Sequence, residues 1–154
     1  MIALKQILVP TDFSEASTIA VRYAKALAEA FDASLHLMHV QEDPFLLSAA
    51  PEGFYPPAGF YEDMEKAANA KLEQVLIQAE LGRAQTTVVA RKGSPFVEII
   101  RYARELEIDL IVMGTHGRGP IAHMLLGSVA ERVVRKAPCP VLTVRHPEHE
   151  FVMP

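Results

Sequence analysis

The chain has 154 residues, half of them hydrophobic, and a formal net charge of -4. This size and apolar content predict a single domain with a sizeable core, which we place at residues 1–146, followed by a short tail at 147–154. The negative balance argues against nucleic acid as a partner, and no apolar run approaches the length of a membrane span. The single cysteine, Cys139, cannot form an internal disulfide. We therefore expect a cytoplasmic protein without a nucleic-acid or membrane partner.

The first forty residues predict a strand, a helix and a second strand. A buried strand is expected over residues 2–10, where Pro10 ends its apolar run. Ser14 is a good N-cap, and apolar residues at i, i+4 spacing extend the helix to Phe31. We expect the aromatic and methionine side chains of this and later helices to lie in the core. Residues 34–41 alternate in polarity and predict the second strand.

A proline-rich segment follows. Residues 42–59 contain four prolines and two glycines, which is typical of a long loop, and loops of this length are usually functional or mobile. We expect a mobile loop over about 42–60. Helical periodicity returns from Phe60 to Leu81, with Gly82 as the C′ residue.

The second half of the chain continues to alternate strands with helices. Ser94 and Pro95 open a helix in the usual N-cap and first-turn positions. The remaining expected elements are strands at 85–91, 109–113 and 140–145, and helices at 95–106 and 128–136. Alternation with continuous apolar strands predicts an open parallel sheet with helices on both faces, an α/β fold of Rossmann-like architecture. Ligands of such folds bind beyond the carboxyl ends of the strands, where Pro10 and Met113 are expected to face one crevice.

A glycine-rich loop follows the fourth strand. It places Gly114, Gly117 and Gly127-Ser128 at the spacing Gly-x2-Gly-x9-Gly-Ser. Glycine allows close approach of backbone to a ligand, and the free N–H groups at the start of a helix attract an anion. His116, Arg118 and His123 supply positive or protonatable groups without a P-loop lysine. The loop thus predicts a phosphate site, although a plain glycine-rich turn with Ser128 as an ordinary N-cap remains an alternative.

This loop resembles the nucleotide signature of the ATP-binding universal stress proteins. Two further blocks share the resemblance, ILVPTDFS at residues 7–14 and LGSVAERVVRKAPCPVLTVR at residues 126–145. The resemblance extends over essentially the whole chain to Arg145. It implies a five-stranded sheet of order 3-2-1-4-5, ATP in the crevice with Mg²⁺ held through the phosphates, and a homodimer.

The resemblance also assigns roles to individual residues. Asp12 is placed for a ribose hydroxyl, Val40 for the adenine and the glycine loop for the ribose and phosphates. A histidine at position 123, where the family often carries Lys or Arg, makes the outer phosphate contact weaker, because histidine is often uncharged at neutral pH. The full set of expected ligand-binding residues is Pro10, Thr11, Asp12, Val40, Met113, Gly114, Thr115, His116, Gly117, Arg118, Gly119, Gly127, Ser128 and Val129.

Three functions are compatible with these residues. The first is a nucleotide-responsive regulatory protein for stress response, acting as a dimer through the edge strand Val141–Val144 and on an unknown protein partner. The second is a slow ATP hydrolase or phosphotransferase, against which stands the lack of a convincing general base. The third is a dimerisation module without ligand, which would not need three glycines in one loop.

Three other patterns give weaker evidence of function. His36 and His39 are separated by an odd number, so they are expected on opposite faces of their strand and not as a metal pair. Cys139 is expected to be a small buried residue, since no feature lowers its pKa. Residues 117–122 fit G-x-G-x-x-A only formally, because they follow the fourth strand and contain Pro120.

Overall fold

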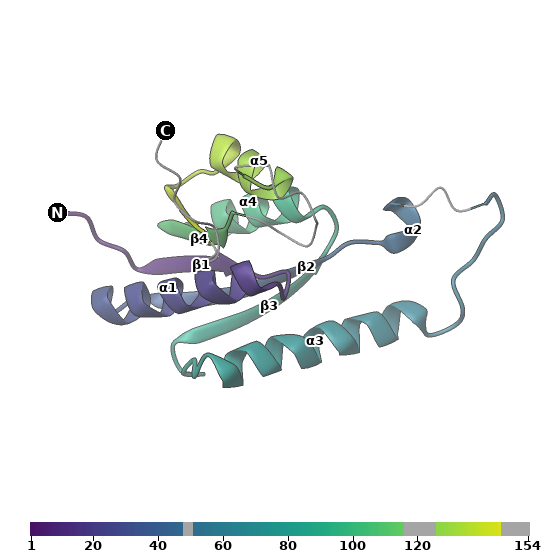
Figure 1. The fold of residues 1–154 in the computed structure, drawn as a ribbon, viewed down its shortest axis with the longest axis horizontal. Helices are drawn as coiled ribbons and strands as arrows, with labels where there is room; N and C mark the ends of the chain where they lie inside the picture. Colours follow the sequence, from purple (N-terminus) through teal and green to yellow (C-terminus); the bar gives the residue numbers. More distant parts are fainter. Residues whose placement is uncertain (48–50, 116–125, 146–154) are drawn as a thin grey trace.

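The fold is a parallel five-stranded sheet between two layers of helices. The computed structural model describes residues 1–47, 51–115 and 126–145. The strands pair in the order β3-β2-β1-β4-β5, and all pairs are parallel, which confirms the predicted order and fold class (Figure 1). The strands are β1 (Gln6–Pro10), β2 (Ser34–Gln41), β3 (Thr86–Lys92), β4 (Leu110–Gly114) and β5 (Val141–Val144). The helices are α1 (Glu15–Phe31), α2 (Pro44–Leu47), α3 (Phe60–Gln78), α4 (Pro95–Glu105) and α5 (Ser128–Lys136).

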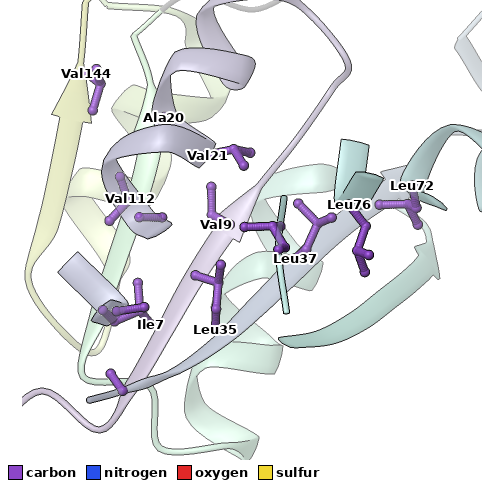
Figure 2. Packing of buried hydrophobic residues seen from close by; sticks show 14 residues of the cluster. Ile7, Val9, Ala20, Val21, Leu35, Leu37, Leu72, Leu76, Val112 and Val144 are labelled. Atoms are coloured by element: carbon purple, nitrogen blue, oxygen red, sulfur yellow. The ribbon is translucent and has the colours of Figure 1, made fainter. Parts of the chain in front are cut away.

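Each face of the sheet has its own core. Odd-numbered β1 and β2 residues such as Ile7 and Leu37 pack against α1 and α3 (Figure 2). Even-numbered neighbours such as Leu8 and Met38 pack against α4 and α5 on the other face. This follows from the pleat, which directs successive side chains to opposite faces, and explains why the strands are apolar throughout.

The face that α1 buries differs from the expected one. Ser14 is the N-cap, as predicted, and its hydroxyl accepts the N–H of Ser17. The buried stripe, however, consists mostly of alanines with Val21, whereas Tyr23 and Phe31 are 53% and 46% exposed. The expectation that the helix aromatics lie in the core is wrong here, because small side chains allow α1 to lie close to the sheet and leave no room for rings between them.

Two element boundaries were also predicted wrongly, and one short helix was not predicted. β1 begins at Gln6 rather than residue 2, and Ile2 is exposed. The expected loop contains the short helix α2, whose first turn is closed by Asp43: its carboxylate accepts the N–H of Phe45 at 2.9 Å. α3 ends at Gln78, and the left-handed C′ position belongs to Glu80 (φ 53°) rather than Gly82.

The end of α3 is fixed by the burial of Leu81. The N–H of Leu81 bonds back to the carbonyl of Leu76 at 2.9 Å, which is the wide bond of a Schellman motif. Leu81 is buried in the α1/α3 core. The gain from burying this side chain offsets the cost of a left-handed glutamate before it. None of the described helices is long and apolar enough to cross a membrane.

His36 and His39 lie on opposite faces of β2, as predicted. His36 is buried on the α4 side, between the hydroxyl of Tyr102 and the side-chain carbonyl of Gln6, both at 2.7 Å. The Gln6 oxygen accepts a hydrogen bond from Nε2–H, and in the neutral ring Nδ1 accepts one from the Tyr102 hydroxyl. Burial lowers the pKa of His36 below its ordinary value of 6.5 and raises that of Tyr102.

This arrangement predicts a loss of stability in mild acid. Because the pKa of His36 is lower in the folded than in the unfolded chain, its contribution is fully present above pH 6.5 and is lost as pH falls from there through the folded-state pKa. We expect the free energy of unfolding in urea to fall more steeply between about pH 6.5 and 5 in the wild type than in His36→Asn. Equal slopes for the two proteins would assign the pH dependence to other groups.

Candidate functional site

A cleft of about 920 Å³ opens at the carboxyl ends of β1, β2 and β4. It lies where the chain order of the sheet reverses, between β1 and β4, which is the usual ligand position in open α/β sheets. The β1–α1 turn and the ends of β2 and β4 form its base. The start of α5 closes one side, and the first half of α3 closes the other.

Ten of the fourteen expected ligand-binding residues line this cleft. They come from four separate stretches of the chain, which the fold brings together. These residues are Pro10, Thr11, Asp12, Val40, Met113, Gly114, Thr115, Gly127, Ser128 and Val129. The other four, His116, Gly117, Arg118 and Gly119, lie outside the described residues, as does His123.

The β1–α1 turn is held by its own side chains. The buried Thr11 hydroxyl accepts the N–H of Phe13 at 3.1 Å and lies 3.0 Å from the Ser17 hydroxyl. The Asp12 carboxylate accepts the N–H of Ser14 at 3.0 Å and also its hydroxyl. Phe13 has φ 65°, a conformation rare for a bulky side chain. Asp12 thus acts as a turn residue, and the same bonds fix its position at the cleft.

The two ends of the glycine-rich loop are joined. The carbonyl of Thr115 accepts the N–H of Gly127, and the N–H of Thr115 bonds to Val144 of β5 at 3.0 Å. Eleven residues of sequence therefore leave and return at one point of the cleft, directly beside the ends of β1 and β4. The wall of the cleft at Thr115 and Gly127 is built from backbone that the sheet itself anchors.

Gly114 serves helix packing in this structure. A Cβ placed on it would lie 3.0 Å from the backbone carbon and oxygen of Ala16 in α1 and 3.1 Å from its side chain. Its φ is also outside the positive range. The sequence interpretation, that a glycine here serves approach of a ligand or a positive φ, therefore misses the contact with α1.

The start of α5 has no side-chain cap. Gly127 is the N-cap residue, with φ -64° and ψ 156°, and as a glycine it makes no side-chain bond to the first turn of the helix. The first N–H groups of a helix have no partner within it. Gly127, Ser128 and Val129 all line the cleft, so this helix end presents donors and the positive end of its dipole to a ligand.

The sequence interpretation missed the α3 side of the cleft. Phe13 and His39 form a ring pair with centroids 4.4 Å apart, and the Lys71 ammonium lies 5.5 Å from the centre of the Phe13 ring. His39 also bonds through Nδ1 to the carbonyl of Thr11 at 2.8 Å. Phe13 directly follows Asp12 in the ILVPTDFS block, so its place at the cleft could have been predicted from the sequence. Nothing in the sequence indicates that Lys71, 58 residues later in the chain, lies beside the Phe13 ring.

Other candidate chemistry finds no support among the described residues. They contain no group of three His, Cys, Asp or Glu side chains that could hold a metal ion. Cys139 is half-buried, and burial together with the charge of Asp109 raises its pKa. A thiol with a raised pKa is a poor nucleophile. The expectation that Cys139 is a buried residue is met only in part, because its side chain stays partly accessible.

Comparison with known proteins identifies relatives along almost the whole chain. The profile of the universal stress protein family matches residues 3–145. Universal stress protein MJ0531 of Methanocaldococcus jannaschii is 35% identical over 146 residues, which cover 95% of this chain and 85% of that protein.

Solved structures agree with this result. The structure of protein MJ0577 of the same organism is 31% identical, with a TM-score of 0.80 over 96% of this chain and 99% of that one. A universal stress protein solved in complex with cAMP is 28% identical, with a TM-score of 0.68 over 94% of this chain and 98% of that one. The chain therefore belongs to the universal stress protein family.

Proposed function

We propose that this protein binds ATP in the cleft and acts as a nucleotide-responsive regulatory protein of the stress response. One observation carries the proposal: ten residues expected to contact ATP, from four separate stretches of sequence, line a single cleft. A relative of the same fold that binds cAMP supports an adenine nucleotide as the ligand class.

The cleft suits ATP in its chemistry. The uncapped start of α5 offers backbone donors to the phosphates, and the Ser128 hydroxyl adds another. Asp12 is held by Ser14 at the turn that would face the ribose, and Val40 and Met113 offer apolar surface to the base. We expect Mg²⁺ to enter with the nucleotide, held through the phosphates, as is usual for this ion.

We infer binding with little or no hydrolysis. The described carboxylates that line the cleft are Asp12 and Glu42, which follow β1 and β2. The described lining residues at the start of α5, where the phosphates are placed, include no carboxylate. A general base must lie within hydrogen-bond reach of the water that it activates. This distribution of acids favours a regulatory protein over the alternative of a slow ATP hydrolase or phosphotransferase.

Two measurements on one sample test the proposal. Mass spectrometry of small molecules released from the purified protein should detect an adenine nucleotide, and calorimetry of the emptied protein should show ATP binding. Phosphate release from the same ATP should stay well below about 1 s⁻¹, the lower end of ordinary enzymatic turnover. No heat of binding with ATP and Mg²⁺ would contradict the ligand, and ordinary turnover would favour the enzyme.

We further propose a homodimer through β5. This strand pairs with β4 on one side and forms one edge of the sheet, with Leu142 38% exposed. An exposed apolar edge strand invites pairing with another chain. Antiparallel pairing with the same strand of a second copy satisfies both edges by two-fold symmetry. It also places two nucleotide clefts on one particle, which gives ATP a route to influence assembly.

A single proline should weaken this dimer. The carbonyl of Pro140 accepts the N–H of Ile111 in β4, and the carbonyl of Val144 accepts that of Thr115. The backbone groups of successive strand residues point to opposite sides, so Thr143 directs its N–H to the outer edge. Thr143→Pro removes that donor while leaving the β4 ladder intact, and edge strands tolerate such a proline. We expect sedimentation at micromolar concentration to show a dimer for the wild type and mostly monomer for the variant.

The opposite edge of the sheet provides the control. The carbonyl of Gln85 accepts the N–H of Leu35 in β2, so the backbone groups of Gln85 face β2. Ala90 lies five residues later, an odd number, and therefore directs its N–H to the opposite side, away from the sheet. Ala90→Pro makes the same chemical change in β3 and should leave the dimer unchanged. A monomeric wild type, with or without ATP, would show that the β5 edge is covered in another way.

A further inference from the structure

Two surfaces that extend beyond the nucleotide cleft have opposite character, one rich in cations and the other in acids and exposed rings. The first, here called the basic groove, is a surface cleft of about 470 Å³ on the α4/α5 layer. Its floor is apolar and its rim is charged. It is lined by Phe96, Val97, Ile100, Arg101, Arg104, Glu105 and Lys136.

The acids at the groove are already paired, whereas several of its cations are not. Buried Glu98 holds Arg101 at 2.7 Å, and Glu105 holds Arg91 at 3.0 Å. No described carboxylate lies within ion-pair distance of Arg104 or Lys136, nor of Arg132, whose guanidinium lies 5.2 Å from the centre of the Phe96 ring. In a chain of net charge -4, this layer therefore presents a local positive surface with apolar side chains at its centre.

The second surface, here called the acidic arm, comprises residues 42–46 and 51–65. The stretch 42–65 contains six Asp or Glu residues and no Lys, Arg or His. It also exposes large apolar side chains, which monomeric proteins rarely gather in one place. They are Leu46 at 87%, Phe54 at 50%, Tyr55 at 85% and Tyr61 at 42%.

The arm has a structure of its own. The Phe45 ring packs against Phe54 at 5.0 Å and Phe60 at 5.2 Å between centroids, and Tyr61 donates its hydroxyl to Asp43 at 3.0 Å. These contacts lie within the arm. Its two ends are tied to the rest of the fold, because Glu65 pairs with Lys92 of β3 at 3.0 Å and Glu42 lines the nucleotide cleft. Figure 1 shows α2 and the path toward α3 standing away from the sheet and from the α4/α5 layer. On the outside of the arm, the acids Glu52, Glu62 and Asp63 are exposed beside Leu46 and Tyr55.

We infer that the acidic arm of one copy docks in the basic groove of a second copy. Each surface supplies what the other lacks: acids with exposed rings on the arm, and in the groove cations without a carboxylate partner among the described residues, around an apolar floor. Helix-dipole effects account for acids at the start of α3 and for Lys136 at the end of α5. They do not account for the exposed apolar side chains beside these charges, which a docked partner would cover.

The contact is heterologous, since it joins two different surfaces. Each copy keeps a free arm and a free groove after docking, so association continues beyond a pair unless it closes into a ring. This property separates the contact from the β5 dimer, which is self-complementary. The inference does not rest on ATP binding, and its test is independent of nucleotide.

Charge reversal on each surface provides the test. The groove variant is Arg104→Glu with Lys136→Glu, and the arm variant is Glu62→Lys with Asp63→Lys, all at exposed positions. In sedimentation velocity from about 1 to about 100 μM, the wild type should grow in average mass with concentration, and each variant should not. Raising salt from about 0.05 to about 0.5 M should reduce wild-type growth, because the pairs are exposed and screened.

Mixing the variants gives the decisive result. The groove variant keeps an intact arm and the arm variant keeps an intact groove, so an equal mixture should recover one step of association and stop there. Arg22→Glu, an exposed reversal on α1, is the matched control and should behave as the wild type, and circular dichroism checks that each variant is folded. If a reversed helix end unfolds a variant, Arg104→Gln with Lys136→Gln replaces it and should reduce growth in mass.

Three results would overturn the inference. They are a wild-type mass independent of concentration and salt, an arm variant that associates like the wild type, and a mixture that fails to recover any association. The second would mean that another acidic segment or partner occupies the groove. Loss of the β5 dimer in Thr143→Pro should leave arm-to-groove association in place, so the two contacts fail separately.

Discussion

Gly127→Val is expected to weaken ATP binding by about 30- to 150-fold while leaving the far-UV circular dichroism unchanged. The variant places a branched side chain at the N-cap of α5, beside the backbone donors proposed for the phosphates. Loss of one or two hydrogen bonds to a charged group costs about 2–3 kcal/mol, which corresponds to that loss of affinity. The backbone angles of Gly127 are accessible to valine, so the fold should survive.

Gly82→Val is the matched control for this experiment. Gly82 lies in the exposed turn after α3, and a Cβ there meets only the end of the flexible Gln85 side chain. The same change in volume and branching should leave ATP affinity within error of the wild type. Equal calorimetric affinity of Gly127→Val and wild type would place the phosphates away from the start of α5.

The sheet and its ligand edge could be predicted from the sequence because their signals are local. The apolar runs at β1, β2 and β4 encode burial on both faces, and each is followed directly by a turn or cap such as Ser14. Parallel strands bring their carboxyl ends to one edge, so residues following different strands meet without further information. Asp12 and Val40 are assigned to the ligand through the resemblance to the universal stress proteins, and Ser128 by its place at a helix start; this edge of the sheet is where the three residues meet.

The parts that could not be predicted depend on contacts between distant residues. The burial of alanines instead of Tyr23 on α1 follows from how closely the helix approaches the sheet, which periodicity does not encode. The C′ position of α3 falls on Glu80 because Leu81 packs into the core, although Gly82 is the residue type that is more typical of this position. Lys71 reaches Phe13 only because α3 packs beside β2.

The glycine loop contains one glycine whose role could be predicted from the sequence and one whose role could not. Gly127 stands at the start of a helix, where the sequence predicts a ligand contact from local chemistry alone. Gly114 has the same appearance in the sequence, yet a Cβ on it would meet α1. A glycine that permits a ligand and a glycine that permits a helix are indistinguishable until the packing is known. The two residues should therefore respond differently to substitution.

Gly114→Ala is expected to lower stability even in the absence of nucleotide. The added Cβ would lie 3.0 Å from the backbone of Ala16, and a helix backbone cannot give way as a flexible side chain does. Overpacking of this kind costs about 1–3 kcal/mol, and each kcal/mol lowers the Tm of a chain this size by about 2–4 °C. Denaturant unfolding of the emptied protein measures the loss directly, with Gly82→Ala as the control that should cost little.

The same substitution should also reach the cleft. Ala16 lies in the first turn of α1, directly after the turn that carries Thr11 and Asp12, so a shift of α1 away from β4 moves both residues. ATP affinity of Gly114→Ala should therefore fall together with stability, whereas in Gly127→Val it falls alone. If Gly114→Ala matched the wild type in unfolding and lost only ATP binding, Gly114 would serve the ligand as the sequence interpretation held, and the contact with Ala16 would be one that α1 accommodates without cost.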